Sequence, residues 1–368
     1  MKKYINNTEW DAPYFIGDIT SKIYCFPWCE NVQKEQNITV FKSRKEVMHS
    51  GYLPCKNCCS ILPHGSWQDF EQEIKLFVPK EFAFKENLQY LQRSPNECMY
   101  DIKDDKIYRI LSIEQEKPLI EISADEEDNL VIRFINNTVI QPKWIRATVA
   151  SFVREWFDLD TNLSPFYVLA EKDKLLNTPI KEHYGLRNMG IPDLFEALCW
   201  GILGQQITLT YAYTLKRRLV ENFGEHVEWN GNKYLIFPLP QKIAKLTVED
   251  LLPLKMTIKK CEYLIGVAQL MVDGKLTKQS LLHTNDHKKA EKFLVRIRGI
   301  GPWTANYVLM RCLRFPTAFP IDDVGLHNVI KLLTGSETKP TKKEIKEYAT
   351  TWTNWESYAT FYLWRTLY

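Results

Sequence analysis

The chain has 368 residues, 45% of them apolar and 13% aromatic, and a formal net charge of only +3. This length allows roughly two or three domains, and the apolar content excludes a mainly disordered chain. No run approaches the ~20 apolar residues of a membrane span, and the segment MKKYINNTEWDAPYF has no apolar signal-peptide core, so we expect a cytoplasmic protein. Because the net charge is small, any nucleic-acid site must be a local patch.

Three segments of different character follow one another. Residues 1–62 carry cysteines and aromatic residues without a long helical period, and Pro, Gly and Ser at 60–68 indicate a linker. Residues 68–158 contain the strand-like patterns KIYRILSI, PLIEISA and NLVIRFINN, and helical spacing returns near their end. Residues 159–368 are helical. We predict an α+β multidomain protein with a small four-cysteine zinc domain, a β-rich domain and an all-α region.

Two closely spaced cysteine pairs lie in the first segment. Cys25 and Cys29 are separated by three residues, and Cys55 and Cys58 by two. Four thiolates in this arrangement suit one tetrahedral zinc ion, and a unit of about 60 residues needs such a metal to stay folded. We therefore predict a structural zinc site. The later cysteines lie in apolar surroundings and are expected to be packed thiols: Cys98, Cys199, Cys261 and Cys312.

The segment TSKIYCFPWC…SGYLPCKNCC resembles the zinc-binding N-terminal domain of the Ada DNA-alkylation response proteins. The resemblance implies that Cys25 is both a zinc ligand and a methyl acceptor from DNA methylphosphotriesters. A zinc-bound thiolate stays ionised and nucleophilic, which suits that role. This chain has Phe26 and Leu53 where the family usually has arginines, so two phosphate contacts are missing. Zinc with methyl transfer and zinc as a structural ion alone both remain open.

A Gly-Ile-Gly turn separates two helical patterns near residue 300. The pattern runs from Leu294 through Gly299, Ile300 and Gly301 to Thr304 and is typical of a helix–hairpin–helix. Glycines supply positions where a side chain would clash or φ must be positive. The turn and the following helix N-terminus point backbone N–H groups outward, which suits a DNA phosphate. Such turns also occur in proteins that bind DNA without acting on it.

An acidic pair, Asp322 and Asp323, follows the turn by about twenty residues. Either residue can cap the helix predicted at VGLHNVIK, which leaves the other one available for chemistry. The turn, the Phe-Pro loop and the acid together resemble the HhH-GPD superfamily of DNA glycosylases. That resemblance maps the catalytic carboxylate to Asp323. Superfamily members that also cut the strand carry a lysine where this chain has Trp303, so the resemblance implies a monofunctional enzyme.

From about residue 77 to its end the chain resembles the 3-methyladenine DNA glycosylase II (AlkA) family. The matching segments are NECMYDI, LGQQ, GIGPWTANYVLMR and WESYATFYLWR. The family has a β-rich domain followed by the helical catalytic region. Trp303 and Tyr307 are spaced i, i+4 and share one helix face, where aromatic rings can stack on a cationic alkylated base. The resemblance adds Trp364 to this base pocket and maps the residue that fills the gap left by the extruded base to Gln206.

The expected function is excision of alkylated bases from double-stranded DNA, without an organic cofactor and by a monomer. The family resemblance also implies a monovalent cation bound to the carbonyls of the Ile297–Gly301 turn. The main alternative is an Ada-like methylphosphotriester acceptor or alkylation-response regulator, although no separate helix-turn-helix module is evident between residues 60 and 160. A DNA-binding module without activity and a glycosylase with lyase activity are further alternatives, and Asp323 and Trp303 respectively argue against them.

Overall fold

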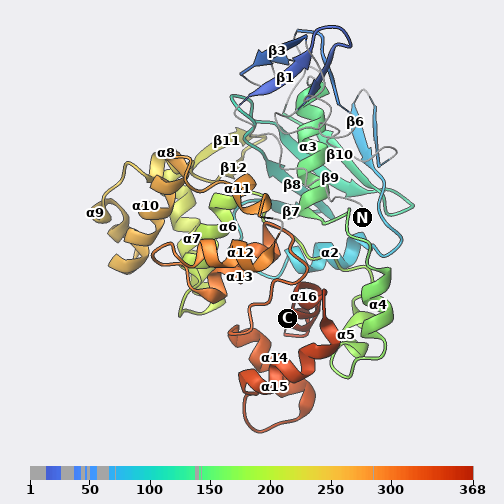
Figure 1. Ribbon diagram of the computed structural model, residues 1–368, viewed down its shortest axis with the longest axis vertical. Coiled ribbons are helices and arrows are strands. Elements are labelled where there is room, and N and C mark those ends of the chain that lie inside the picture. Colours follow the sequence, from blue (N-terminus) through green and yellow to red (C-terminus); the bar gives the residue numbers. More distant parts are fainter. Residues whose placement is uncertain are drawn as a thin grey trace.

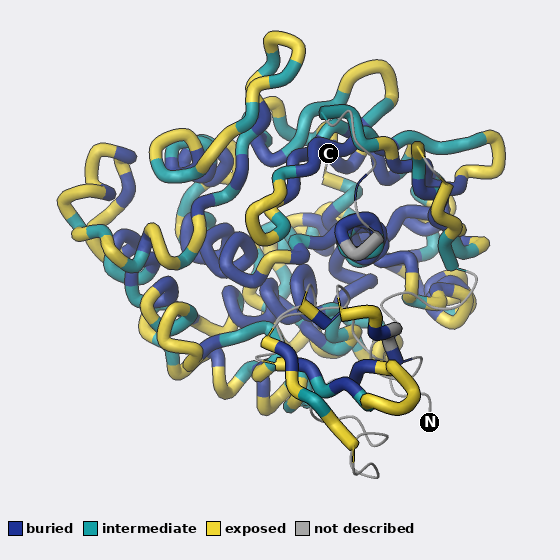
Figure 2. The backbone as a smooth tube through the Cα atoms, turned by 90° about the horizontal axis from the view of Figure 1, so that it is seen from above, coloured by how far each residue is buried: buried dark blue, intermediate teal, exposed yellow. Residues whose placement is uncertain are grey.

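A computed structural model of the full chain describes residues 14–25, 37–42, 46–47, 50–55, 66–70, 72–136, 141, 143–284 and 286–367. A small sheet comes first in the chain, then a larger sheet covered by one long helix, then two groups of helices (Figure 1). Buried backbone gathers in the middle of these elements, and exposed turns lie at the periphery (Figure 2). Within the described ranges, no helix is both long and apolar enough to cross a bilayer.

The first sheet brings two of the predicted zinc ligands together. Its strands are β1 (Phe15–Asp18), β2 (Ile23–Cys25), β3 (Ile38–Phe41) and β4 (Leu53–Pro54), in the order β3-β1-β2-β4. Strands β2 and β4 run parallel, and the Cys55 N–H donates to the Tyr24 carbonyl at 2.8 Å. Cys25 and Cys55 are therefore neighbours in a small aromatic core, 6% and 4% exposed. Cys29 and Cys58 lie outside the described residues.

The larger sheet is antiparallel and has the order β5-β6-β10-β9-β8-β7. Its strands are β5 (Trp67–Asp69), β6 (Glu73–Leu76), β7 (Asp101–Lys103), β8 (Lys106–Ile110), β9 (Leu119–Ala124) and β10 (Leu130–Phe134). Ile74, Ile107, Ile122 and Ile132 are fully buried, because alternate residues of these strands point to the covered face. Helix α3 (Lys143–Trp156) lies across this sheet (Figure 1). The strand patterns read from the sequence between residues 106 and 134 are confirmed.

The remaining chain is mostly helical. Its elements are α2 (Phe84–Leu91), α4 (Ser164–Ala170), α5 (Asn177–Glu182), α6 (Leu194–Leu203), α7 (Leu209–Phe223), α8 (Pro240–Ile243), α9 (Val248–Leu251), η3 (Leu252–Leu254), α10 (Ile258–Val272), α11 (Lys278–Leu282), α12 (His287–Leu294), α13 (Pro302–Arg311), α14 (Val324–Thr334), α15 (Lys342–Tyr348), η4 (Ala349–Trp352) and α16 (Glu356–Arg365). Helix α6 is buried along its whole length and forms the centre of this region.

A β-hairpin interrupts the helices and was not predicted. Strands β11 (Glu225–Trp229) and β12 (Asn232–Ile236) pair in antiparallel fashion around Asn230 and Gly231, whose φ values are 46° and 73°. An Asn-Gly pair with positive φ at both positions is the favoured two-residue hairpin turn. Tyr234 and Ile236 pack against β8 and β9, so the hairpin joins the helical region to the larger sheet. The prediction that this stretch is helical throughout was wrong at these residues.

Candidate active site

Asp323 is the N-cap residue of α14 and lies at the wall of a cleft. Its backbone is extended, with φ −69° and ψ 123°, and its Oδ1 accepts the Leu326 N–H at 2.9 Å. Asp323 is thus a helix cap, as one interpretation of the sequence had it. The cap fixes the carboxylate in one orientation and leaves Oδ2 for other partners.

Two tryptophans hold the same carboxylate. The indole N–H of Trp303, on α13, donates to Oδ2 at 2.8 Å, and the indole N–H of Trp364, on α16, donates to Oδ1 at 2.8 Å. The three groups therefore come from three helices that lie far apart in the sequence. Because an indole has a single N–H donor, whose direction is set by the ring plane, these two hydrogen bonds fix the two rings relative to the carboxylate.

Asp322 is placed differently from its neighbour. Its side chain is 38% exposed and forms an ion pair with Lys342 at 2.5 Å. We expected one acid to cap the helix and the other to be available for chemistry. Instead Asp323 has both roles. Its Oδ1 accepts the helix-capping bond from Leu326 N–H, and its Oδ2 accepts the indole N–H of Trp303 in the cleft.

The predicted pocket aromatics form a continuous stack. The ring centroids of Trp303 and Tyr307 are 5.6 Å apart and those of Tyr307 and Trp364 are 6.0 Å apart, with interplanar angles of 33° and 32°. Tyr307 and Trp364 are each 6% exposed. Burial raises the pKa of Tyr307, against the opposing charge of Arg311, so the phenol stays neutral at physiological pH. Tyr358 and Tyr362 are also buried, but they pack on Phe166.

The cleft has a volume of about 1300 Å³ and a basic lining. Four arginines and two aspartates are the charged residues that line it: Arg93, Arg296, Arg298, Arg311, Asp322 and Asp323. The chain as a whole carries only +3, so positive charge is locally enriched here. A cationic surface around an aromatic pocket suits a nucleic-acid strand whose base enters the pocket.

The Gly-Ile-Gly turn joins α12 to α13 as predicted. Pro302 is the first residue of α13, where a missing N–H costs nothing. The N–H groups of Gly299, Gly301, Trp303 and Thr304 have no acceptor among the described residues. Ile300 and Thr304, two of the predicted DNA-binding residues, line the cleft but are only 3% and 1% exposed.

The two glycines of the turn have different structural roles. Gly299 has φ +93°, and a Cβ there would lie 2.2 Å from Cγ of Tyr263. Gly301 has φ −85°, and a Cβ there would meet nothing within 4 Å. Gly299 is therefore required by the fold. Gly301 lines the cleft and has open space where a side chain would be.

We expect Gly299→Ala to lower the free energy of unfolding by about 2–4 kcal/mol, because the cost of a strained φ adds to the cost of the clash with Tyr263. Gly301→Ala is the matched control, and we expect it to change stability by less than about 0.5 kcal/mol while weakening binding to duplex DNA. Urea unfolding and fluorescence anisotropy measure the two quantities. Equal stability losses in both variants would contradict these separate roles.

The loop after α6 is tied to the same turn. Gln205 Nε2 donates to the Gly299 carbonyl at 2.8 Å and to Thr304 Oγ1 at 3.0 Å. Lys260 Nζ donates to the Leu203 carbonyl at 2.7 Å, which fixes the end of α6. Gln206, predicted to fill the gap left by an extruded base, is exposed and has φ +55°. Gln206 thus has a left-handed backbone conformation and directly follows Gln205, whose side chain is hydrogen-bonded to the turn.

A second bond network places the loop that leads to Asp323. Asn306 Oδ1 accepts the Phe319 N–H at 3.1 Å, and Asn306 Nδ2 donates to the Pro302 carbonyl at 3.0 Å. The side chain therefore joins the start of α13 to the Phe-Pro loop. The segment between Trp303 and Asp323 is thus held in place twice, by the Asn306–Phe319 hydrogen bond and by the hydrogen bond between Trp303 and Asp323.

The cleft-lining residues that sequence reasoning missed include Tyr90, Arg93, Trp200 and Arg311. Tyr90 and Arg93 come from the region that contains the larger sheet, so only the tertiary structure brings them here. Arg311 had a signal in the sequence, because it follows Trp303 and Tyr307 at spacing i+8 and i+4 on one helix face.

Three parts of the chain match family models. Residues 199–354 match the HhH-GPD superfamily base excision DNA repair proteins, residues 75–198 the 8-oxoguanine DNA glycosylase N-terminal domain, and residues 4–60 the metal binding domain of Ada. These matches confirm the resemblances read from the sequence and the three-part fold class.

Individual relatives agree with the family models. A DNA-3-methyladenine glycosylase of Bacillus subtilis (strain 168) is 52% identical over 303 residues, which cover 82% of this chain and 100% of the relative. DNA-3-methyladenine glycosylase 2 of Escherichia coli (strain K12) is 33% identical, over 50% of this chain and 65% of the relative. The solved 3-methyladenine DNA-glycosylase from Archaeoglobus fulgidus superimposes with a TM-score of 0.66 at 23% identity, covering 79% of this chain and 96% of that one. The solved structure shows the shared fold.

Proposed function

The chain belongs to the DNA-3-methyladenine glycosylases of the HhH-GPD superfamily, and from this membership we propose that it removes alkylated bases of the 3-methyladenine and 7-methylguanine type from double-stranded DNA. The bond between base and sugar is hydrolysed, and an abasic site remains. One observation carries this proposal: the two indoles that bound the base pocket are the groups that hold the Asp323 carboxylate. Base and sugar would therefore be placed by a single rigid unit.

The aromatic stack supplies selectivity. A base reaches the pocket only after it leaves the duplex, and Gln206 would fill the gap it leaves. N3- and N7-alkylated purines carry a positive charge that normal bases lack, and aromatic faces attract cations. Trp303, Tyr307 and Trp364 would therefore hold an alkylated base more tightly than a normal one.

Asp323 supplies the catalytic charge. As the C1′–N bond breaks, its electron pair moves to the cationic base, which leaves neutral, and positive charge develops on the sugar. The carboxylate stabilises that charge, because it is fixed before the reaction begins. Water then adds to C1′ and loses a proton to Asp323. Trp303 has no amine, so no Schiff base with the sugar forms.

The proposal predicts a specific product. On a duplex containing one alkylated purine, the purified protein is expected to release the free base and leave a strand that breaks only after alkali treatment. Borohydride added during the reaction is expected to trap no protein–DNA adduct, since trapping requires an amine-derived Schiff base. Strand breaks without alkali, together with a trapped adduct, would show a lyase that uses a different nucleophile.

The cysteine-rich domain is proposed to hold one zinc ion through Cys25, Cys29, Cys55 and Cys58. The buried neighbours Cys25 and Cys55 fit this, since thiolates are soft donors that zinc prefers. Bound zinc would keep the thiolates ionised and hold the domain together. A second activity is favoured by the Ada match. The Cys25 sulfur would take the methyl group of a DNA methylphosphotriester, forming an S–C bond while the O–C bond breaks and a phosphodiester anion leaves.

Metal removal distinguishes the function of the zinc domain from that of the glycosylase region. Chelation is expected to remove one zinc ion per chain, measured by atomic absorption, and to leave the release of alkylated bases unchanged. Mass spectrometry of the zinc-loaded protein after incubation with methylated DNA is expected to find a methyl group on Cys25. Loss of base release with the metal would contradict the separation, and an unmodified Cys25 would limit the domain to a structural or DNA-docking role.

Three smaller proposals accompany this function. A monovalent cation would bind the turn carbonyls between Ile297 and Gly301, where Gly299 O already accepts Gln205 Nε2 and keeps a second lone pair. The protein would act as a monomer. It would meet its DNA in the cytoplasm, with the nucleoid.

A further inference from the structure

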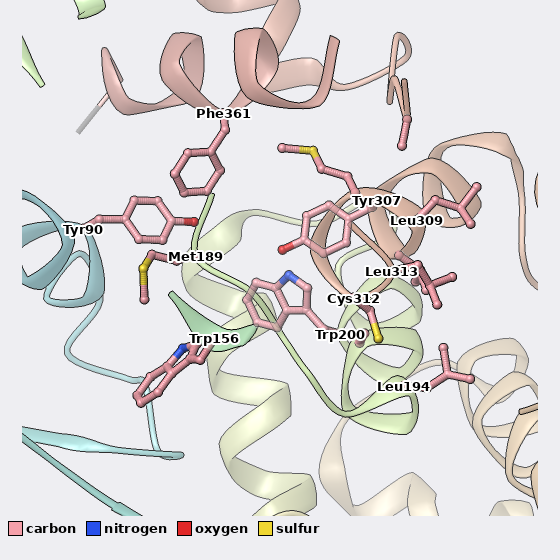
Figure 3. Packing of buried hydrophobic residues seen from close by; sticks show 14 of the residues in the cluster. Tyr90, Trp156, Met189, Leu194, Trp200, Tyr307, Leu309, Cys312, Leu313 and Phe361 are labelled. Atoms are coloured by element: carbon pink, nitrogen blue, oxygen red, sulfur yellow. The ribbon is translucent and has the colours of Figure 1, made fainter. Parts of the chain in front are cut away.

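Asn306 is a polar side chain in a helix that is buried along most of its length. Helix α13 is buried from Thr304 to Arg311, and Asn306 is 5% exposed. Two residues of the same helix, Tyr307 and Leu309, lie among the packed hydrophobic side chains of Figure 3. Because so little of the Asn306 side chain reaches solvent, its amide needs hydrogen-bond partners within the protein.

The protein supplies four partners, which is the full capacity of an amide. Oδ1 accepts the Phe319 N–H at 3.1 Å and lies 2.8 Å from Nε2 of His287. Nδ2 donates to Glu291 Oε1 at 2.7 Å and to the Pro302 carbonyl at 3.0 Å. An amide oxygen accepts two hydrogen bonds and an amide nitrogen donates two, so every position is used. Since both oxygen positions are acceptors, His287 must carry a proton on Nε2.

Two of these bonds fix the neighbours of the proposed catalytic acid. Pro302 directly precedes Trp303, whose indole N–H donates to the Asp323 carboxylate. Phe319 lies four residues before Asp323, and the Asp323 N–H donates to the Pro320 carbonyl at 2.9 Å, so the chain between them is tightly turned. Asn306 thus holds the backbone beside both partners of the Trp303–Asp323 hydrogen bond.

The other two bonds reach α12, the first helix of the helix–hairpin–helix. His287 is the first residue of α12, and Glu291 lies about one turn later. The hairpin that suits a DNA phosphate is therefore joined to the loop of Asp323 through one side chain. Asn306 is not among the described residues that line the cleft, so it acts through its neighbours.

We propose that Asn306 is a positioning residue of the reaction, which fixes the Asp323 carboxylate relative to the DNA-binding hairpin without contacting base or sugar. This proposal rests on the proposed function. A phosphate held at the hairpin sets the position of the deoxyribose and hence of C1′. The carboxylate has to lie close to that carbon to stabilise the charge that develops there. The Asn306 amide links these two positions.

Asn306→Asp tests the proposal, because it keeps the shape of the side chain and replaces both N–H donors by an acceptor. The new carboxylate keeps the bonds from Phe319 and His287 but faces Glu291, whose Oε1 lies 2.7 Å from the substituted atom. We expect single-turnover release of 3-methyladenine at pH 8 to fall about 10²-fold, the loss that a displacement of about 1 Å can cause. The Kd for the alkylated duplex should stay near its wild-type value, because the arginines of the cleft are unchanged.

The loss of rate is expected to depend on pH. Two carboxylates so close together share one proton, so the pair has one raised pKa, and below it the shared proton replaces the lost hydrogen bond. The ratio of the variant rate to the wild-type rate should therefore rise as pH falls from 8 to 5. The other titratable groups around Glu291 are present in both proteins: Asp286, His287 and Lys288 on α12, and Glu356 on α16, which also interacts with Lys288.

A second substitution exchanges donor and acceptor across the same contact. Glu291→Gln, added to Asn306→Asp, supplies an amide N–H to the new carboxylate. We expect the double variant to recover part of the rate at pH 8 and to lose most of the pH dependence of the ratio.

Asn222→Asp is the matched control. Asn222 is also a helical asparagine whose Nδ2 donates to the carbonyl four residues earlier, that of Arg218, at 2.8 Å, but it is exposed. We expect the control to release 3-methyladenine at the wild-type rate at both pH values.

Three outcomes would overturn the inference: a loss of release in Asn306→Asp that is matched by a loss of DNA binding, a rate ratio that does not change with pH, or a double variant no faster than the single one. If Asn306→Asp does not fold, Asn306→Ala takes its place. An unchanged rate in Asn306→Ala, or an equal weakening of DNA binding, would overturn the inference. Absence of release by the wild-type protein would instead overturn the proposed function, and this inference with it.

Discussion

Asp323→Asn is expected to lower the release of 3-methyladenine by on the order of 10³-fold, the range found when a group stabilising transition-state charge is removed. The asparagine keeps the shape of the side chain and an oxygen for the Leu326 N–H and the Trp364 indole. It places an amide where Trp303 now donates to Oδ2, so one hydrogen bond is lost at a cost of about 1 kcal/mol. The fold and the basic cleft remain, so binding to alkylated duplex should persist.

Asp322→Asn is the matched control for this variant. Asp322 is the adjacent acid, is exposed and pairs with Lys342 at the surface. Loss of a surface ion pair changes stability by about 0–1 kcal/mol, and we expect the release rate to stay near the wild-type value. Single-turnover kinetics and anisotropy binding on the same duplex measure both properties. Undiminished release by Asp323→Asn would assign the chemistry to another group.

Lys216→Met is expected to lower the free energy of unfolding by about 3–5 kcal/mol at neutral pH, because it removes the cation paired with the buried Glu97 carboxylate and leaves Glu196 paired with Arg109 alone. Lys216 Nζ lies 3.1 Å from Glu97 and 2.9 Å from Glu196, and the side chains are 6%, 11% and 5% exposed. The lysine is on α7 and Glu196 on α6, whereas Glu97 precedes strands β7 to β10 of the larger sheet. The network therefore joins the two regions behind the base pocket, where all three residues line a small cavity.

The effect of Lys216→Met depends on pH with a definite sign. In the wild type, burial raises the pKa of Glu97, but Lys216 and the backbone N–H groups of Met99 and Cys98 outweigh it and hold the pKa below its ordinary value. Glu97 then contributes stability above its unfolded pKa, and this contribution is lost as pH falls through the folded pKa. Without Lys216, burial favours the protonated acid, so the variant loses stability as pH rises above the ordinary pKa.

Urea unfolding at pH 5 and pH 8 tests this sign. The stability difference between wild type and Lys216→Met should be larger at pH 8. Lys275→Met is the control, because the Lys275–Asp273 pair has a similar length, 2.8 Å, but side chains that are 67% and 50% exposed. We expect a change of less than about 1 kcal/mol there, with little pH dependence. A Lys216→Met deficit as small as that of the control would show that the buried network contributes no stability.

Local sequence patterns correctly predicted those features whose structure is determined by residues close together in the sequence. The alternation in β8 to β10, the glycine turn and the i, i+4 pair of Trp303 and Tyr307 are all set by backbone period, and each is where it was expected. The β11–β12 hairpin was missed, although Asn230-Gly231 between two strand-like segments signals it, because helical patterns surround it on both sides.

The rest of the site depends on tertiary contacts. Nothing in the sequence indicates that the indoles of Trp303 and Trp364 converge on one carboxylate, or that Tyr90 reaches the cleft from the region of the larger sheet. The different needs of Gly299 and Gly301 arise from Tyr263, which lies on another helix. Arg311 could have been placed on the pocket face by spacing, but the rings of Tyr90 and Phe361 beside it are evident only from the tertiary structure.

The most direct measurement of the central claim is the amount of free base released by the wild-type protein from a duplex with a single alkylated purine, under single-turnover conditions. The expected result is release of the alkylated base in equal amount to abasic sites, with an otherwise identical duplex carrying adenine left intact. A protein that binds the alkylated duplex but leaves the base attached would contradict the account.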